Sequence, residues 1–368
     1  MIILHVTEML TKVANGPRFS VTGLTSALNR IEGVEAGVLN VGSHWKLDKE
    51  ETDRYDFPFF ARYERFNSLP APFNHPDLIV FHGVYKKHYL SLWQDLSAQG
   101  IPYVVTPRVS LTKQAQSQKA WKKRLANRLI MNSFIGHASA IHYLTPGEME
   151  ASLRINNKYF IAGNGVQIPE LPVESKRAGN RMIFIGRYDI QHKGLDVLMQ
   201  AISHIKDELL ARGLSIDLYG SGRKVQRLLE RQGKEKGLEN VLSIHGPIFA
   251  SEKEEALQEA DLFLACSRFE GLPMALLEAM SHGVCVLATP GTNMAQEVEE
   301  TQSGWQVNLD FKELGAAILK AFEDKEELAR RGLNARRLAS EEYNWDRIAE
   351  LTLAEYQKLL QERTGAVK

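Results

Sequence analysis

Glu270 and Glu278 stand on either side of the start of a predicted helix, with seven residues between them. The segment 266–283 reads CSRFEGLPMALLEAMSHG and follows a short apolar run typical of a buried strand. Pro273 suits the first position of that helix, and Gly283 suits the position just after its end. The sequence therefore predicts one carboxylate before a helix and one inside it. The alternative is that the two carboxylates are solvated charges, one on a loop and one on a helix face.

The N-terminus of this predicted helix is suited to binding an anion or a sugar. The backbone N–H groups within residues 271–275, which Pro273 lacks, would point toward a ligand and carry the positive end of the helix dipole. We therefore expect a phosphate or a sugar hydroxyl to bind beside Gly271, Leu272 and Pro273. A carboxylate next to a phosphate needs hydrogen-bond donors, so Glu270 is predicted to accept bonds from the hydroxyl groups of a bound sugar.

A second group of candidate residues follows the apolar run at 182–186, where Gly186 allows the backbone to turn. Arg187 and Lys193 are six residues apart and could reach the two phosphoryl groups of a diphosphate from different sides. The pattern predicts a pair of cations that holds a diphosphate, and the alternative is two solvated surface charges. Together with Glu270, these cations are the candidate catalytic residues of the C-terminal half.

Two further loops of the C-terminal half contain glycines after predicted strands. In LYGSGRKV, Gly220 and Gly222 resemble a dinucleotide fingerprint, but the position of its third glycine is Val225. We interpret Gly220 as part of a tight strand-to-helix turn beside the donor. In HGPI at 245–248, backbone groups near Ile248 could bind the edge of a nucleobase, and a plain turn is an equal alternative.

The N-terminal half offers two weaker candidates. Gly16, between Asn15 and Pro17, precedes a predicted helix, where a glycine permits close approach of the donor or only a turn. His82 follows the apolar run DLIVF and could hydrogen-bond or relay a proton in catalysis, although a single histidine is as often structural. The histidines and acids show no spacing typical of a metal site, so we expect no metal.

A basic helix is predicted at 119–134, where five cations surround Trp121, Leu125 and Leu129. Such a helix could lie on an anionic membrane. The alternative, which we favour, is a helix whose apolar stripe packs on a core while its charges are solvated.

The elements that must position these residues alternate along the chain. Short apolar runs, each suited to a strand buried on both faces, are separated by segments of helical periodicity. This predicts an α/β protein with two Rossmann-like, doubly wound parallel sheets. Ligands of such sheets bind beyond the carboxyl ends of the strands, so we expect the two domains to face a central cleft that holds a ligand.

A change of composition divides the two predicted domains. Residues 169–180 contain prolines, charges and a Gly-Asn pair, which is typical of a linker. It separates an N-terminal Rossmann-like domain, 1–168, from a C-terminal domain, 181–344, that contains the loops of Arg187 and Glu270. Residues 345–368 have the apolar spacing of a helix, which we expect to pack back on the N-terminal domain.

The composition excludes several classes of protein. Equal numbers of basic and acidic residues, 45 of each, leave no overall positive charge for a general nucleic-acid binder. The two cysteines, Cys266 and Cys285, lie in apolar stretches and make neither a disulfide framework nor a four-cysteine metal site. The sequence has no apolar run long enough to span a membrane and no signal-peptide pattern. We therefore expect a cytoplasmic protein, at most peripheral to the inner face of the membrane.

Three motifs of this chain resemble the signature of a known enzyme family. They are GRYDIQHKGLD at 186–196, EGLPMALLE at 270–278 and NGV at 164–166. Together they are similar to the family 4 retaining glycosyltransferases, also called glycosyl transferases group 1, which have the GT-B fold. The resemblance covers nearly the whole chain. One departure is the loop at 107–110, which reads PRVS where relatives commonly have Pro-His-Gly.

The resemblance implies a role for each carboxylate and cation. Glu270 would bind hydroxyl groups of the donor sugar, and Glu278 would bind the ribose of the nucleotide. Arg187 and Lys193 would bind the diphosphate. In relatives the leaving phosphate is thought to take the proton of the acceptor, so a base such as His82 is not required.

The residues and the resemblance predict a hexosyltransferase that needs no metal or other cofactor. It would move a sugar from a nucleoside diphosphate, with UDP as the expected nucleotide, to a hydroxyl of a saccharide or lipid-linked saccharide. The anomeric configuration would be retained, and the product would belong to polysaccharide or glycoconjugate synthesis. Two alternatives stay open: a sugar-nucleotide 2-epimerase with the same donor site, and a sugar-nucleotide binder that does not catalyse. A nicotinamide dehydrogenase is disfavoured by Val225 and by the lack of an acidic residue for the cofactor's ribose.

Overall fold

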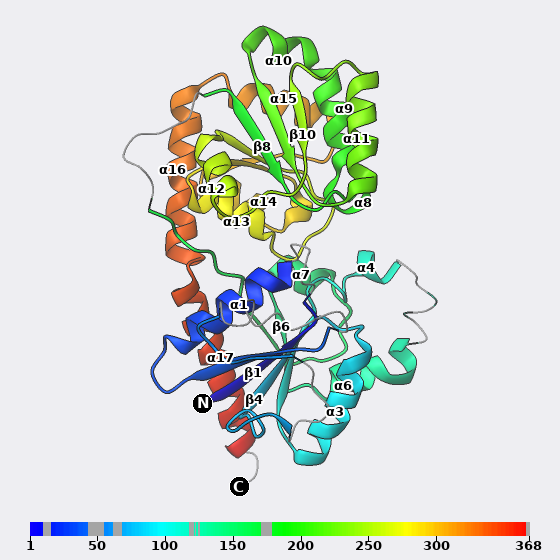
Figure 1. The fold of residues 1–368 in the computed structure, drawn as a ribbon, viewed down its shortest axis with the longest axis vertical. Coiled ribbons are helices and arrows are strands. Elements are labelled where there is room, and N and C mark those ends of the chain that lie inside the picture. The colour runs from blue at the N-terminus through cyan, green and yellow to red at the C-terminus, as the bar shows by residue number, and fades with distance from the viewer. Residues whose placement is uncertain are drawn as a thin grey trace. The chain divides into compact units, whose positions relative to one another are not determined.

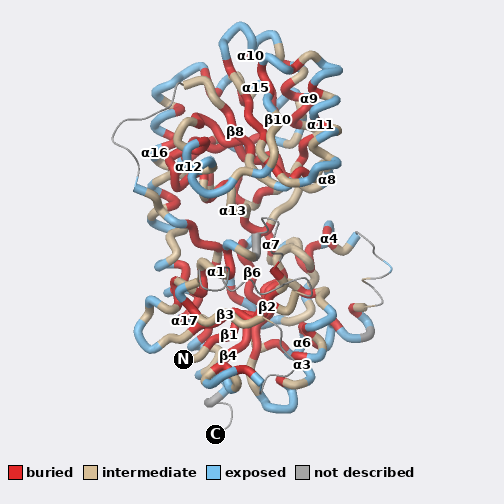
Figure 2. The backbone as a smooth tube through the Cα atoms, viewed as in Figure 1, coloured by how far each residue is buried: buried red, intermediate tan, exposed pale blue. Residues whose placement is uncertain are grey.

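The structure is a computed structural model of the chain. It describes residues 1–9, 16–42, 55–61, 68–117, 126–170 and 179–365, together with Trp121 and Lys123. The chain divides into two compact units, Met1–Gly165 with Trp345–Lys368, and Val166–Asn344 (Figure 1). Each unit is built around its own parallel sheet, and Figure 2 shows that burial is concentrated along the strands of each sheet.

The first unit contains a seven-stranded parallel sheet in the order β3-β2-β1-β4-β5-β6-β7. Its strands are β1 (Ile2–Thr7), β2 (Glu35–Asn40), β3 (Phe59–Ala61), β4 (Leu78–His82), β5 (Tyr103–Thr106), β6 (Ala140–Tyr143) and β7 (Tyr159–Ile161). The chain builds outward from β1 to β3 and then returns to place β4 on the other side of β1. The loops after β1 and β4 therefore lie at the point where the strand order reverses, which is where ligands of such sheets bind.

Helices cover both faces of the first sheet. They are α1 (Gly16–Asn29), α3 (Lys87–Gln99), α4 (Lys113–Ser117), the π-helix η2 (Asn127–Met131), α6 (Asn132–Gly136), α7 (Pro146–Ala151) and α17 (Trp345–Gly365). On one face, Leu24 and Leu28 of α1 and Ile348 and Tyr356 of α17 pack in one core with strand residues such as Ile3. The other face packs against α3 and α6. The C-terminal helix is thus part of the core of the first unit.

The second unit contains a six-stranded parallel sheet in the order β10-β9-β8-β11-β12-β13. Its strands are β8 (Arg181–Ile185), β9 (Ser215–Tyr219), β10 (Leu242–His245), β11 (Leu262–Ala265), β12 (Cys285–Ala288) and β13 (Gly304–Gln306). Here the order reverses between β8 and β11, which are hydrogen-bonded neighbours. The loops that leave these two strands contain both motifs singled out in the C-terminal half.

Both faces of the second sheet are also covered by helices (Figure 1). These are α8 (Ile190–Lys193), α9 (Leu195–His204), α10 (Lys206–Arg212), α11 (Arg223–Glu235), α12 (Ala250–Glu259), α13 (Met274–Ser281), the 3-10 helix η3 (Pro290–Thr292), α14 (Ala295–Glu300), α15 (Phe311–Ala321) and α16 (Lys325–Glu342). One core joins the sheet to α9, α11 and α15, as Leu198, Leu229 and Leu314 show. Helix α13 packs against α16, and α16 contacts β12.

The predicted fold class, two doubly wound parallel sheets, is confirmed. Each apolar run that the sequence analysis interpreted as a strand contains a β-strand in the structure. Two strands were not predicted, β3 and β13, which have three residues each and lie at sheet edges. Strands this short and only partly buried leave no apolar run to recognise.

The predicted basic helix at 119–134 is described only in part. Trp121 is 68% exposed, whereas Met131 and Phe134 are buried in the core of the first unit. Contact with a membrane stays a prediction. Within the described ranges, no helix combines the length and the apolar character needed to cross a membrane. Outside the described residues lie Lys119, Lys122, Arg124 and Leu125.

Candidate active site

Two loops meet at the carboxyl ends of β8 and β11 in the second unit. The first, 186–189, continues into α8, and the second, 266–273, continues into α13. Because β8 and β11 are neighbours at the reversal of strand order, their loops leave the same edge of the sheet side by side. The topology therefore brings together residues that are about 80 positions apart in the sequence.

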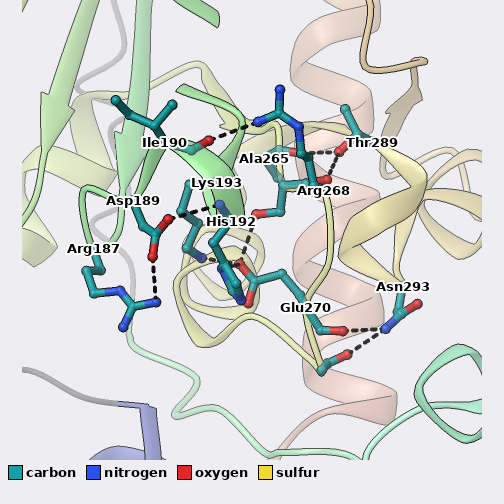
Figure 3. A network of polar contacts seen from close by, with 12 residues as sticks. Arg187, Asp189, Ile190, His192, Lys193, Ala265, Arg268, Glu270, Thr289 and Asn293 are labelled. Carbon is teal, nitrogen blue, oxygen red and sulfur yellow. Dashed lines mark hydrogen bonds and ion pairs between the residues drawn. The ribbon is translucent and has the colours of Figure 1, made fainter. Parts of the chain in front are cut away.

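Lys193, the last residue of α8, forms an ion pair with Glu270 of the second loop (Figure 3). The ammonium group of Lys193 donates to Oε1 of Glu270, and Ser267 Oγ donates to the same oxygen at 2.9 Å. Only 16% of the Lys193 side chain and 11% of the Glu270 side chain are exposed. In such a poorly solvated place, contacts between these charges and a ligand are stronger than at an open surface. The structure thus joins the cation that the sequence assigned to a diphosphate and the carboxylate assigned to a sugar.

His192, next to Lys193, also borders this pair. Its Nδ1 lies 3.7 Å from Oε1 of Glu270, and its ring meets Phe269 edge-on with 4.3 Å between ring centroids. Burial lowers the pKa of His192, and the Glu270 carboxylate opposes this shift. His192 is therefore neutral near pH 7 and adds no positive charge to the site.

Local backbone geometry places Lys193 against the second loop. Asp189 caps α8 by accepting a hydrogen bond from the backbone N–H of His192 at 3.0 Å. Gly194 then takes a left-handed conformation with φ 64° between α8 and α9, and a Cβ atom there would overlap the carbonyl oxygen of Cys266. Only glycine meets both requirements, because other residues are strained at this φ and would push the two loops apart.

Replacing Gly194 with alanine is expected to lower the free energy of unfolding by about 2 kcal/mol or more, since strain at positive φ adds to the overlap with Cys266. Gly213 is the matched control, because it has nearly the same φ of 63° and a Cβ atom added there would meet nothing within 4 Å. Gly213→Ala should lose only about 1 kcal/mol. Denaturant unfolding of both variants measures this difference, and equal losses would show that the close approach to Cys266 is not a constraint.

Arg187 lies at the exposed side of the same loop. Its side chain is 61% exposed and pairs with Asp189, with 3.1 Å between Nη2 and Oδ2. A pair this exposed is weak, so Arg187 can turn to another anion at little cost. Gly186 precedes it, and a Cβ atom at that position would lie 3.5 Å from Cε of Lys193. That distance is an ordinary van der Waals contact, and the tighter neighbour of such a Cβ atom would be the Phe184 ring at 3.1 Å.

Polar contacts fix the loop that carries Glu270 (Figure 3). Arg268 makes two hydrogen bonds of 2.8 Å to the two oxygens of Asp196, and it holds the pKa of that carboxyl below its usual value. Asn293 donates to the carbonyl oxygens of Glu270 and Gly271 at 2.6 and 3.2 Å. The sequence analysis missed these supporting residues, since each comes from a segment remote in sequence from its partner.

Glu278 belongs to a second ion pair. It lies within α13, and its Oε1 is 2.7 Å from Nζ of Lys253 on α12, with 20% of the Glu278 side chain exposed. The helix begins at Met274, one residue later than predicted, and Pro273 is its N-cap in an extended conformation. Gly283 follows the helix at φ 72°, as its position in the sequence predicted.

The loops after β9 and β10 adjoin the first loop. The backbone N–H of Gly220 donates to the carbonyl oxygen of Gly246 at 3.1 Å, and a Cβ atom at Gly220 would overlap the carbonyl oxygen of Gly186. Gly220 thus occupies a tight turn beside the loop of Arg187. Ile248 lines a cavity of about 360 Å³ together with Tyr219, whose ring stacks on that of His245.

In the first unit, His82 ends β4 and is only 3% exposed. Its Nε2 lies 3.0 Å from Nδ1 of His5, and its Nδ1 lies 3.2 Å from Nη2 of Arg108. Burial, and then the positive charge of Arg108, lower the pKa of His82 well below its usual value. Both ring nitrogens already have protein partners, His5 and Arg108. A catalytic role for His82 stays a prediction.

The remaining candidates are a glycine at the start of α1, the cysteines and the possible metal ligands. Gly16 is the first residue of α1, and Asn15 lies outside the described residues. Cys266 is fully buried, which raises the pKa of its thiol to about 12. Among the described side chains, no group of three or more His, Cys, Asp and Glu residues could hold a metal ion.

Two family models match the chain, one in each unit. The model described as glycosyl transferases group 1 matches residues 179–324, and the model described as a glycosyl transferase 4-like domain matches residues 21–159. The first match includes both Glu270 and Glu278, and the second includes His82.

Similar proteins and structures agree with these matches. An MMP alpha-(1->4)-mannosyltransferase of Mycolicibacterium hassiacum is 25% identical over 285 residues, which are 72% of this chain and 67% of that protein. A GDP-mannose:cellobiosyl-diphosphopolyprenol alpha-mannosyltransferase of Xanthomonas campestris is 24% identical over 312 residues, which are 82% of this chain and 79% of that protein. The crystal structure of HepE from Anabaena in complex with UDP and glucose has a TM-score of 0.74 at 18% identity, covering 97% of this chain and 100% of that chain. With family matches in both units and this shared architecture, the chain belongs to the glycosyl transferases group 1 and has the GT-B fold.

Proposed function

We propose that this glycosyltransferase moves a sugar from a UDP-sugar to a hydroxyl group of a saccharide or lipid-linked saccharide, with retention of the anomeric configuration. The observation that carries the proposal is the Lys193–Glu270 pair at the reversal of strand order in the second unit. Open parallel sheets bind nucleotides at such a point. A poorly solvated cation beside a poorly solvated carboxylate suits a ligand that has a diphosphate next to a polyhydroxylated ring.

In this proposal the donor's diphosphate lies against Lys193 and Arg187. Arg187 leaves its weak surface pair with Asp189, and Lys193 shares its charge between Glu270 and the phosphate oxygens. Gly186 and Gly220, in adjoining loops of the second unit, lie beside the diphosphate. The nucleobase lies near Ile248.

The sugar ring then lies beside Glu270, whose carboxylate accepts hydrogen bonds from ring hydroxyls. Gly271, Leu272 and Pro273 border the ring, and the N-terminus of α13 faces the diphosphate. Glu278 binds the ribose, so it exchanges part of its contact with Lys253 for the two ribose hydroxyls.

In the reaction, the acceptor oxygen forms a bond to the anomeric carbon while the bond from that carbon to the phosphate oxygen breaks. The departing diphosphate gains negative charge, which Arg187, Lys193 and the helix N-terminus stabilise. The acceptor's proton passes to the released phosphate, so no separate base is needed. Glu270 stabilises the positive character of the ring by holding its hydroxyls.

The identity of the nucleotide is tested by calorimetry with UDP and GDP in parallel. UDP is expected to bind more tightly, and a preference for GDP would favour a GDP-mannose donor, as the name of the relative from Xanthomonas campestris suggests. Binding of neither nucleotide would reject the proposal. Incubation with donor alone, followed by product analysis, separates transfer from 2-epimerisation, because an epimerase releases a changed sugar without any acceptor.

Sugar transfer is expected to continue undiminished in excess EDTA, because two cations and a helix N-terminus take the place of a divalent ion at the diphosphate. Initial rates with and without EDTA, after dialysis against the chelator, measure this. Loss of activity that Mg²⁺ restores would contradict metal independence.

A further inference from the structure

Arg108 of the first unit is a half-buried guanidinium group without a carboxylate partner among the described residues. It follows β5, and its contacts with other side chains are two approaches to His82 Nδ1, from Nε at 3.4 Å and from Nη2 at 3.2 Å, and one bond from Nη1 to Ser20 Oγ at 2.8 Å. Burial lowers the pKa of Arg108 to about 10, which still leaves it charged at neutral pH. The Glu148 carboxylate favours the charge of Arg108 but makes no hydrogen bond to it among the described contacts, so an anion that meets the guanidinium group directly gains charge-assisted hydrogen bonds.

The donors of Arg108 are not exhausted by these contacts. A guanidinium group has five N–H donors, and no more than three of them are directed at Ser20 and His82. Within the described ranges, one N–H on Nη1 and one on Nη2 have no acceptor. Two donors on separate nitrogens of one planar group match two oxygens of a phosphoryl group or a carboxylate.

The three histidines near Arg108 are uncharged, so they neither repel the guanidinium group nor form an ion pair with it. Arginine only donates, so His82 Nδ1 accepts, and the neutral ring carries its proton on Nε2. That proton is donated to Nδ1 of His5, whose pKa burial lowers to about 3. His142 is also neutral, because burial lowers its pKa to about 4. All three rings are therefore uncharged beside Arg108.

The carboxylate whose charge acts on Arg108 has its hydrogen bonds elsewhere. Glu148 is fully buried, and its two oxygens accept from the backbone N–H groups of Val109 and Leu144. These bonds hold the loop in which Arg108 and Val109 both have positive φ, 50° and 61°. Two consecutive left-handed residues other than glycine are strained, and such strain persists where the surrounding structure imposes a side-chain position.

We propose that Arg108 binds an oxyanion of the acceptor substrate, either a phosphoryl group of a lipid-linked diphosphate or a carboxylate of an acidic saccharide. This inference rests on the proposed function, because it presupposes a transferase with an acceptor substrate. It adds that the acceptor binds to the first unit. It identifies Arg108 as a residue that selects an anionic acceptor. His82 then acts as a positioning residue, which orients the guanidinium group by accepting from it.

Direct binding of small anions tests the proposal without knowledge of the acceptor. The protein is labelled with ¹⁵N-histidine and saturated with UDP, so that the donor site is occupied, and it is titrated with inorganic phosphate and, separately, with acetate. NMR signals of the His82 ring, assigned with the variant His82→Gln, report on Arg108. We expect a saturable shift in the wild-type protein and a loss of affinity of about tenfold or more in Arg108→Gln.

Two further variants separate charge from folding. Arg108→Lys keeps the charge and should retain part of the affinity. Arg30→Gln changes an arginine just after α1 whose side chain is 51% exposed and pairs with Asp346, and it should bind phosphate as the wild type does. A response to phosphate alone assigns a phosphoryl group, and a response to acetate alone assigns a carboxylate.

No saturable shift with either anion in the wild type would overturn the inference, as would equal phosphate affinity in the wild type and Arg108→Gln. UDP binding is measured in the same samples. If UDP fails to bind, the proposed function fails, whereas normal UDP binding without any response to phosphate or acetate removes only the role of Arg108.

Discussion

Replacing Glu270 with alanine is expected to lower the rate of sugar transfer by about 10-fold to 1,000-fold while leaving the affinity for free UDP nearly unchanged. The carboxylate accepts hydrogen bonds from the donor sugar, and each charge-assisted hydrogen bond is worth about 1.5 to 3 kcal/mol, where about 1.4 kcal/mol is tenfold in rate. Free UDP lacks the donor's transferred sugar, so it makes none of these contacts. Its affinity does not fall, because Lys193 loses a partner that competes with phosphate for its charge. Initial rates at saturating donor and calorimetry with UDP measure the two effects.

Glu278 should behave in the opposite way. Glu278→Ala is expected to weaken the binding of UDP itself, because the ribose is part of the free nucleotide. Glu326, an exposed acid in the first turn of α16, is the matched control, and Glu326→Ala should change neither quantity. If Glu270→Ala weakened UDP as much as Glu278→Ala and kept its turnover number, the assignment of sugar and ribose to these two carboxylates would be wrong.

Replacing Lys193 with alanine is expected to weaken UDP binding by about 10-fold to 100-fold. The variant loses a charge-assisted contact with the diphosphate. It also leaves Glu270, whose side chain is only 11% exposed, without its cation, so the carboxylate repels the incoming phosphates. Arg187→Ala should have a smaller effect, because its side chain is 61% exposed and more strongly screened by solvent. Calorimetry with UDP measures all of these affinities.

The double variant Lys193→Ala/Glu270→Ala separates the two causes. Removal of the carboxylate should restore part of the affinity lost in Lys193→Ala, and the recovered part measures the repulsion. Lys312→Ala changes an exposed lysine of α15 and controls for net charge. Unchanged UDP affinity in Lys193→Ala and in Arg187→Ala would show that the diphosphate binds elsewhere.

Much of the fold could be predicted from the sequence because its strands are buried on both faces. Leu262–Ala265 and Cys285–Ala288 are continuous apolar runs, and each pairs with a neighbour inside the sheet. Phe59–Ala61 and Gly304–Gln306 escaped prediction, since an edge strand of three residues is stabilised by pairing with its neighbour rather than by its own pattern. The order of the strands within each sheet also could not be predicted, because it depends on the packing of the whole domain and not on any one strand's residues.

The candidate site could be predicted in part, because Arg187, Lys193 and Glu270 lie in segments that follow two predicted strands and belong to recognisable motifs. The residues that pair with them or support them could not be predicted. Lys253 is one of many charges on α12, and nothing in its position indicates the ion pair with Glu278. Asn293 is a common loop residue whose contact with the Glu270 backbone depends on the folded sheet.

A crystal structure of the protein with bound UDP tests the assignment of the donor site most directly. The proposed site predicts diphosphate oxygens within about 3 Å of Lys193 Nζ and of the Arg187 guanidinium group. It also predicts the ribose hydroxyls against Glu278, and Glu270 turned toward the space that the sugar occupies. A nucleotide bound elsewhere on the chain, with the Lys193–Glu270 pair intact and uncontacted, would contradict the assignment of this pair to the donor.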